Sequence, residues 1–207
     1  EIHESAQRKQ LKNPDARIML DETICFSNPP LGEFAECYQG LRTGDKNRFV
    51  CMFWELPYFN FDWVLLQNSN TSRNSYGGLI NILLWQDGKG ELHASAKERV
   101  KHIASMHESG NRAWGKQGVS INLMRSLGCA RYAGVKFDGN VNVLFPKNPN
   151  NLTAVWCFCN SSEYKDMVRA IDQKLSVTNA TLVKVPFDLE HWQRVAAEKY
   201  PHGLPKP

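Results

Sequence analysis

A basic loop between two glycines, residues 39–49 (QGLRTGDKNRF), places the strongest local constraint on the fold. Gly40 and Gly44 permit positive φ and a close approach of the backbone to a neighbour. Asp45 is placed to cap a helix, which the apolar spacing predicts over 46–54 with Phe49, Met52 and Phe53 on one face. The sequence therefore predicts a structural loop (Gly40, Gly44, Asp45) that leads into a helix.

The same loop has the character of an anion site. The N–H groups at a helix N-terminus suit phosphate, and Arg42 and Arg48 add charge. Arg42 lies between the glycines and is expected to project. Arg48 lies one turn into the predicted helix. We expect its side chain either to contact phosphate or to brace the loop by bonding the loop carbonyls or Asp45. The alternative is an ordinary strand-to-helix turn with a helix cap. When only the residues of this loop are considered, that alternative is the preferred interpretation.

Length and composition place the chain among folded domains. Its 207 residues can form one large domain or two small ones, and contents of 42% hydrophobic and 11% aromatic residues exclude a disordered chain. The first residue is Glu, so we expect a fragment or a processed product. No apolar run reaches the length of a membrane span, and no signal-peptide pattern opens the sequence.

The charges are segregated along the chain, although the net charge is only +4. No acidic residue occurs in 109–137 or in 63–86, whereas the first of these stretches carries five basic residues. Such segregation is typical of a face that binds a polyanion, and solvated loops can also produce it.

The six cysteines contain no C-x-x-C pair, so a zinc ribbon is not indicated, and free thiols in a reducing cytoplasm are expected. Four glycosylation sequons, at Asn70, Asn151, Asn160 and Asn179, leave a secreted, glycosylated binding domain as an alternative.

Periodicity predicts mixed secondary structure. Strands are expected over 34–38, 63–67, 79–85, 119–125, 130–135, 141–145 and 181–186, and helices over 91–108, 152–159, 164–175 and 189–195. Asn160 and Glu163 have capping-box spacing, and Asp188 precedes the last helix as a cap. Without a repeat or linker, the fold class is α/β (α+β): a single mixed domain of twisted, mostly antiparallel strands with flanking helices.

One motif resembles a catalytic site. Asn28-Pro29-Pro30 matches the turn with which amino-methyltransferases hold a flipped adenine, but Leu31 stands at the position of the stacking aromatic ring. No glycine-rich cofactor fingerprint precedes it, and 27 residues cannot form a cofactor-binding fold. A Pro-Pro turn leading into a strand is the preferred interpretation, and a catalytic fragment using Asn28 is the alternative.

No other catalytic or metal constellation is indicated. Glu163-Tyr164-Lys165 is a weak match to a nuclease motif, because no Asp precedes it at strand spacing. The histidines form no H-x-x-x-H pair, so we predict no metal site and expect His93, His102 and His107 to be solvated helix residues.

The loops remain as the candidate functional surface. Glycine-bounded basic loops at 40–48 and 110–118, a polar loop at 68–78 and arginine-bearing strands suit nucleic acid, with Lys and Arg on phosphates and a few Arg, Asn or Gln on base edges. The predicted DNA-binding residues are Arg42, Thr43, Lys46, Asn47, Arg48, Arg73, Tyr76, Arg112, Lys116, Gln117, Arg125 and Arg131.

The order of motifs resembles a known family. Residues 30–50 (PLGEFAECYQGLRTGDKNRFV), followed by Phe53-Trp54-Glu55, are similar to the segment beyond the catalytic domain of large adenine-specific DNA methyltransferases of the type IIG restriction–modification and bacteriophage-exclusion kind. The similarity continues at 114–120 (WGKQGVS), Arg131-Tyr132, 160–162 (NSS) and 177–187.

The resemblance implies a target-recognition domain over 30–200, which binds duplex DNA and is not itself catalytic. Residues 1–29 would then be a connector from the catalytic domain, and 201–207 a tail. S-adenosylmethionine and catalysis are expected in that other domain, which is the expected protein partner, and no cofactor is expected in this chain.

Overall fold

The computed structural model describes residues 7–11, 13, 16, 28–58, 60–71, 75–98, 104–124 and 126–205. The chain forms two compact units: unit 1 comprises Glu1–Cys37 with Pro146–Lys206, and unit 2 comprises Tyr38–Phe145. No helix among the described residues is long and apolar enough to cross a membrane.

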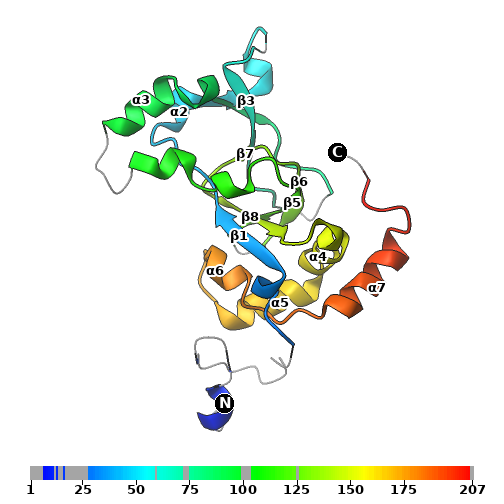
Figure 1. The fold of residues 1–207 in the computed structure, drawn as a ribbon. Coiled ribbons are helices and arrows are strands. Elements are labelled where there is room, and N and C mark those ends of the chain that lie inside the picture. Colours follow the sequence, from blue (N-terminus) through cyan, green and yellow to red (C-terminus); the bar gives the residue numbers. More distant parts are fainter. Residues whose placement is uncertain are drawn as a thin grey trace. The chain divides into compact units, whose positions relative to one another are not determined.

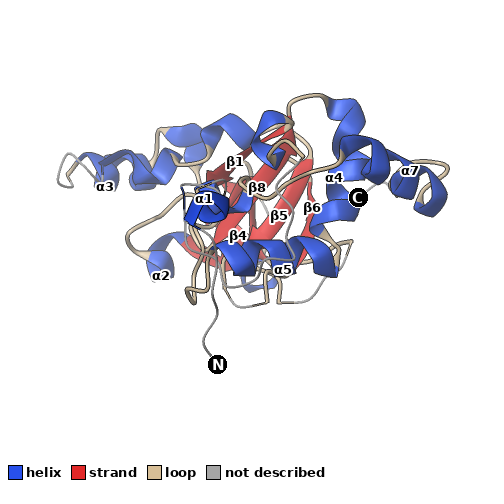
Figure 2. Cartoon of the chain, turned by 90° about the horizontal axis from the view of Figure 1, so that it is seen from below, coloured by secondary structure: helices blue, strands red, loops and turns tan. Residues whose placement is uncertain are grey.

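Unit 1 is mainly helical (Figures 1 and 2). Its centre is α4, whose residues 154–159 are all buried. The ring of Phe158 lies 5.1–5.2 Å from the rings of Tyr164, Phe187 and Trp192, so aromatic packing holds this unit together. The helical segments are α1 (Gln7–Gln10), η2 (Leu31–Glu33), η7 (Pro149–Asn151), α4 (Leu152–Cys159), α5 (Ser162–Ile171), α6 (Asn179–Leu182) and α7 (Leu189–Lys199).

The first sheet has the strand order β1-β8-β5-β6, and β5 runs antiparallel to both of its neighbours. Its strands belong to unit 2 apart from the first three residues of β1 and the last of β8. Every residue of β5 and β8 is buried, so these strands are covered on both faces. The bounds are β1 (Ala35–Gln39), β5 (Gly118–Asn122), β6 (Cys129–Tyr132) and β8 (Val141–Pro146).

The second sheet lies entirely in unit 2, in the order β2-β4-β3-β7, and only the β3–β7 pair is parallel. Buried apolar residues of β3, β4, α2 and α3 form one cluster with the glycine loop: Leu41, Phe49, Leu66, Leu83 and Leu92. The strands are β2 (Val50–Met52), β3 (Trp63–Gln67), β4 (Asn81–Leu84) and β7 (Lys136–Phe137). The helical segments are α2 (Lys46–Phe49), η3 (Phe53–Glu55), η4 (Gln86–Gly88), α3 (Glu91–Lys97), η5 (Ala104–Glu108) and η6 (Asn111–Ala113).

The predicted fold class is confirmed, because two mostly antiparallel four-stranded sheets are combined with helices. The strand at 63–67 occurs with the predicted bounds, and those at 34–38, 79–85, 119–125, 130–135 and 141–145 occur with bounds shifted by a few residues. The final helix starts as predicted, since the Asp188 carboxylate accepts from the His191 N–H at 2.9 Å.

Two element predictions and one cap prediction are wrong. The helix expected over 46–54 ends at Phe49, because Val50–Met52 pair with β4. The strand expected over 181–186 is replaced by α6, whose cap is the Thr178 hydroxyl. The cap of α5 is Ser161 rather than the Asn160–Glu163 box, with the Tyr164 N–H donating to Ser161 Oγ at 3.1 Å. Of the helix expected over 91–108, the described residues form α3 and the 3-10 helix η5.

Candidate nucleic-acid interface

The glycine loop is fixed by backbone contacts on both sides. The Leu41 N–H donates to the Phe137 carbonyl at 2.8 Å, and the Arg42 N–H donates to the Met106 carbonyl at 2.9 Å. Gly40 is required at this crossing, because a Cβ there would lie 2.2 Å from the Asp138 carbonyl oxygen. The loop is therefore a rigid platform.

The second half of the loop turns into α2. Gly44 has a φ of +78°, which favours glycine, and Asp45 then caps the helix by accepting from the Arg48 N–H at 3.2 Å. The structural roles predicted for Gly40, Gly44 and Asp45 are thus visible in the geometry. α2 has only four residues, so the expected long helix with its N-terminal anion site is absent from this part of the described chain.

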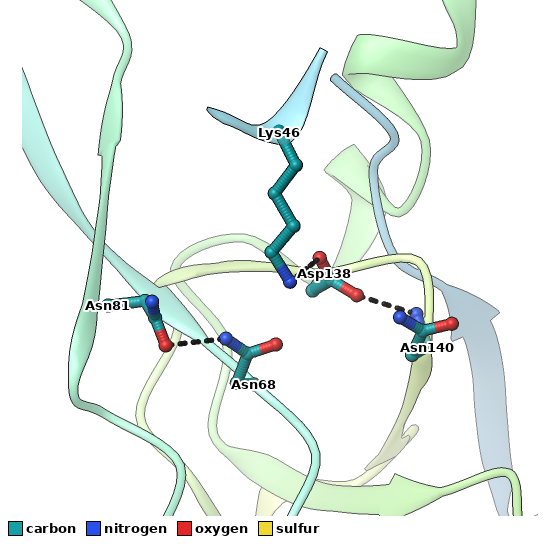
Figure 3. A network of polar contacts seen from close by, with 5 residues as sticks. All are labelled: Lys46, Asn68, Asn81, Asp138 and Asn140. Atoms are coloured by element: carbon teal, nitrogen blue, oxygen red, sulfur yellow. Dashed lines mark hydrogen bonds and ion pairs between the residues drawn. The ribbon is translucent and has the colours of Figure 1, made fainter. Parts of the chain in front are cut away.

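The loop and the turn at 138–140 enclose an open pocket of about 340 Å³ within unit 2. Its lining combines basic, acidic and polar groups: Leu41, Arg42, Thr43, Gly44, Lys46, Asp138, Gly139 and Asn140. Figure 3 shows the polar contacts beside it. Lys46 Nζ lies 3.4 Å from Asp138 Oδ2, and the Asn140 N–H donates to Asp138 Oδ1 at 2.9 Å. The side chain of Lys46 is half exposed, whereas that of Asp138 is largely covered.

Arg42 and Arg48 have different environments. The Arg42 side chain is exposed, and no described residue forms a hydrogen bond or ion pair with its guanidinium. Arg48 Nη2 lies 3.1 Å from Glu91 Oε2, and its guanidinium carbon lies 5.1 Å from the centre of the Phe49 ring. Arg48 thus braces α2 against α3 through Glu91, and its side chain does not reach the loop carbonyls or Asp45 as expected. Thr43 is buried and Asn47 exposed.

The second basic loop carries two cations on an aromatic pair. The rings of Tyr38 and Phe145 are stacked with their centres 5.9 Å apart. Arg112 Nη1 donates to the Tyr38 hydroxyl at 3.3 Å, and Lys116 Nζ lies 4.1 Å from the centre of the Phe145 ring. Both side chains, and that of Gln117, are exposed. The structure therefore brings Arg112 and Lys116 to one aromatic surface of unit 2.

A third pair joins the polar loop to β6. Arg131 Nη1 donates to the Tyr76 hydroxyl at 3.3 Å, and Tyr76 is 44% exposed. Arg73 and Arg125, which were predicted as further contacts, lie outside the described residues. All described members of the predicted set belong to unit 2.

Sequence reasoning missed several residues of this region. Asp138 and Asn140 line the pocket, and the only local signal is the Asp-Gly turn that follows a short strand. Lys136 is one of the five basic residues of 109–137 and was not among the predicted DNA-binding residues. Its Nζ lies 3.7 Å and 4.6 Å from the ring centres of Trp114 and Trp85, and burial lowers its pKa, an effect that Asp87 opposes. Lys136 therefore has a packing role.

The histidine prediction is wrong for the two described members. His107 is 4% exposed, and its Nε2 lies 3.0 Å from Nδ1 of the half-buried His93. Their separation of 14 residues falls outside the H-x-x-x-H spacing by which helical metal sites are recognised. His102 lies outside the described residues.

The Asn-Pro-Pro motif is part of the framework of unit 1. The Pro29 carbonyl accepts from the Phe187 N–H, and the Leu31 N–H donates to the Val185 carbonyl, both at 2.9 Å. Leu31 is fully buried whereas Asn28 is exposed, so the turn anchors the entry to β1. The five described cysteines are free thiols.

Comparison with known proteins finds similarity to solved structures. No protein-family model matches the chain, and no curated protein matches it. The HsdS subunit of Thermoanaerobacter tengcongensis is similar over 93% of this chain, with 10% sequence identity and a TM-score of 0.49. This chain spans 40% of the length of that HsdS chain.

Proposed function

We propose that the chain is a sequence-specific duplex-DNA recognition module of an adenine-specific DNA methyltransferase, without catalysis of its own. The observation that carries DNA binding is the exposed Arg42 guanidinium on a loop that backbone hydrogen bonds hold rigid, at the rim of a polar pocket. A rigidly mounted arginine can bind a phosphate or the edge of a guanine with two donors and loses little freedom on binding.

Other described cations of unit 2 also support DNA binding. Lys46 reaches the pocket, and Arg112 and Lys116 lie on the Tyr38–Phe145 pair. Aromatic rings hold Arg112 and Lys116, and the Asp138 carboxylate pairs with Lys46, while all three residues stay exposed. Such exposed cations suit phosphate contacts along a duplex.

The finer assignment rests on the motif resemblance. The parent protein would be a restriction–modification or phage-defence enzyme of the bacterial cytoplasm. Its methyltransferase domain would bind S-adenosylmethionine and be the partner of this module within the same chain.

Fluorescence anisotropy with a labelled duplex tests the proposal. We expect binding that weakens roughly tenfold or more between low and physiological salt, because each phosphate contact releases counterions. Arg42→Ala should weaken binding. The matched control is Arg194→Ala, an exposed arginine on α7 of unit 1, which should leave binding unchanged. Binding that is absent at every salt concentration, or equal losses in the two variants, would refute the proposal.

A further inference from the structure

A cluster of three potential metal ligands, none of them among the residues assigned to DNA, lies in unit 2. His93 is on α3, and His107 and Glu108 are on η5. Their ligand atoms, one imidazole nitrogen from each histidine and a carboxylate oxygen, all lie within 4.8 Å of one another. The polypeptide thus brings a potential ligand of one helix against two of another.

The distances fit a small divalent ion. His93 Nδ1 and His107 Nε2 are 3.0 Å apart, and His107 Nε2 and Glu108 Oε1 are 4.0 Å apart. Ligands at about 2.0–2.1 Å from a tetrahedral zinc ion lie roughly 3.3 Å from one another. The imidazole pair therefore already has nearly the required separation. The Glu108 oxygen lies within 4.8 Å of both imidazole nitrogens, and its side chain is 46% exposed, so it can rotate inward by the roughly 1.5 Å at most that zinc ligation requires.

The burial pattern also suits an ion. The His107 side chain is only 5% exposed, so its ring is held by packing, whereas the exposed Glu108 leaves an approach from solvent. His93 Nδ1 and His107 Nε2, 3.0 Å apart, form a hydrogen bond in which one nitrogen donates its proton and the other accepts it, because two N–H groups at this distance would repel. A metal ion that binds both lone pairs replaces that proton.

We propose that His93, His107 and Glu108 form a structural site for a divalent transition-metal ion of the zinc class. Two imidazoles favour zinc, nickel, copper or iron over magnesium and calcium, which prefer oxygen ligands. The ion ties α3 to η5. The η5 carbonyl of Met106 accepts the Arg42 N–H, so the ion also stabilises the element on which the glycine loop is anchored. This inference does not depend on DNA binding.

The test uses the full chain, stripped with a chelator and titrated with Co²⁺ and then Zn²⁺. Absorption in the visible range reports Co²⁺ bound to nitrogen and oxygen ligands, and Zn²⁺ competition gives the affinity. We expect one ion per chain. Zinc at 100 times its Kd should raise the Tm by roughly 5–10 °C. Affinity should fall as the pH is lowered, because protons compete for the imidazoles.

Variants separate the site from adventitious binding. His107→Ala should abolish binding. Glu108→Gln, an exposed substitution that leaves the fold intact, should weaken it at least tenfold, and His202→Ala, an exposed histidine of unit 1, should leave it unchanged. Absence of binding would show that the histidines form only a hydrogen bond. Equal binding by wild type and Glu108→Gln would refute the three-ligand site. Binding without a rise in Tm would refute the structural role.

Discussion

Replacing Arg42 or Arg48 by alanine separates recognition from bracing within one loop. Arg42 is exposed, and no described residue forms a hydrogen bond or ion pair with its side chain, so Arg42→Ala removes only the packing of that side chain beside Gly139. Arg48→Ala removes the ion pair with Glu91 and the contact with the Phe49 ring. The two variants remove the same charge from neighbouring positions and should differ in outcome.

The magnitudes follow from these contacts. Arg42→Ala should change the free energy of unfolding by less than about 0.5 kcal/mol, as for other surface substitutions. Arg48→Ala should destabilise by about 1 kcal/mol, since an exposed ion pair contributes roughly 0.2–1 kcal/mol and an exposed cation–π contact roughly 0.5–1 kcal/mol. A loss of this size lowers the Tm by about 2–4 °C in a chain of this length.

The effect of Arg42→Ala on DNA binding distinguishes two kinds of contact. Loss of a base contact should cost about 1–3 kcal/mol, roughly 5- to 150-fold, and relax preference at one base pair. Loss of a phosphate contact should weaken all duplexes alike and reduce the slope of log K against log salt by about 0.9.

The assay combines thermal melting with anisotropy on matched and mismatched duplexes over a range of salt. Arg48→Ala should lower the Tm and weaken binding to a lesser degree than Arg42→Ala. If Arg42→Ala binds every duplex as tightly as the wild type does, the glycine loop is structural and the central claim about it is wrong.

Four further results are expected. Gly40→Ala should lower the free energy of unfolding in urea by at least about 2 kcal/mol, because its Cβ would meet the Asp138 carbonyl. Gly115→Ala, with φ +78° and nothing within 4 Å of its Cβ, should cost about 1–2 kcal/mol, and equal losses in the two variants would contradict the crossing geometry. Asp138→Asn keeps an acceptor for the Asn140 N–H and releases Lys46, so anisotropy should show severalfold tighter DNA binding; unchanged binding would exclude Lys46 from the interface. Asn28→Ala should leave methylation by the full-length parent intact, and loss of activity in a folded variant would revive the catalytic alternative. Without reductant, at least five thiols should react with Ellman's reagent after denaturation; because desolvation raises the pKa of the Cys37 and Cys157 thiols, reaction in the native state at pH 8 should be slower.

Local chemistry explains the successful predictions. A side chain that caps the helix beginning next to it leaves a signature within four residues, as with Asp45 and Asp188. An alternation of apolar and polar residues such as Val119–Asn122 predicts a strand without knowledge of its partners. The fold class needs only such elements in order along the chain.

Predictions failed where a distant segment decides the outcome. Residues 50–52 have the apolar spacing of a helix, but Val50 and Cys51 pair with Leu83 and Ile82 of β4, and this pairing overrides the local preference. His93 and His107 come together only because α3 packs against η5. Neither contact has a signature in the spacing of the sequence.

The glycine loop combines a feature that the local sequence predicts with contacts that only the tertiary structure provides. The sequence indicates that Gly40 allows a close backbone approach, and the structure supplies the neighbour, the chain at 137–138 nearly a hundred residues away. That crossing brings Asp138 beside Lys46 and so offsets one of the two cations at the pocket. Arg42 is the exposed cation of the pocket that has no ionic partner among the described residues, and for this reason we assign the DNA contact to it. The residue was predictable from the sequence, but its distinction from Lys46 and Arg48 depends on contacts with Asp138 and Glu91 that only the tertiary structure provides.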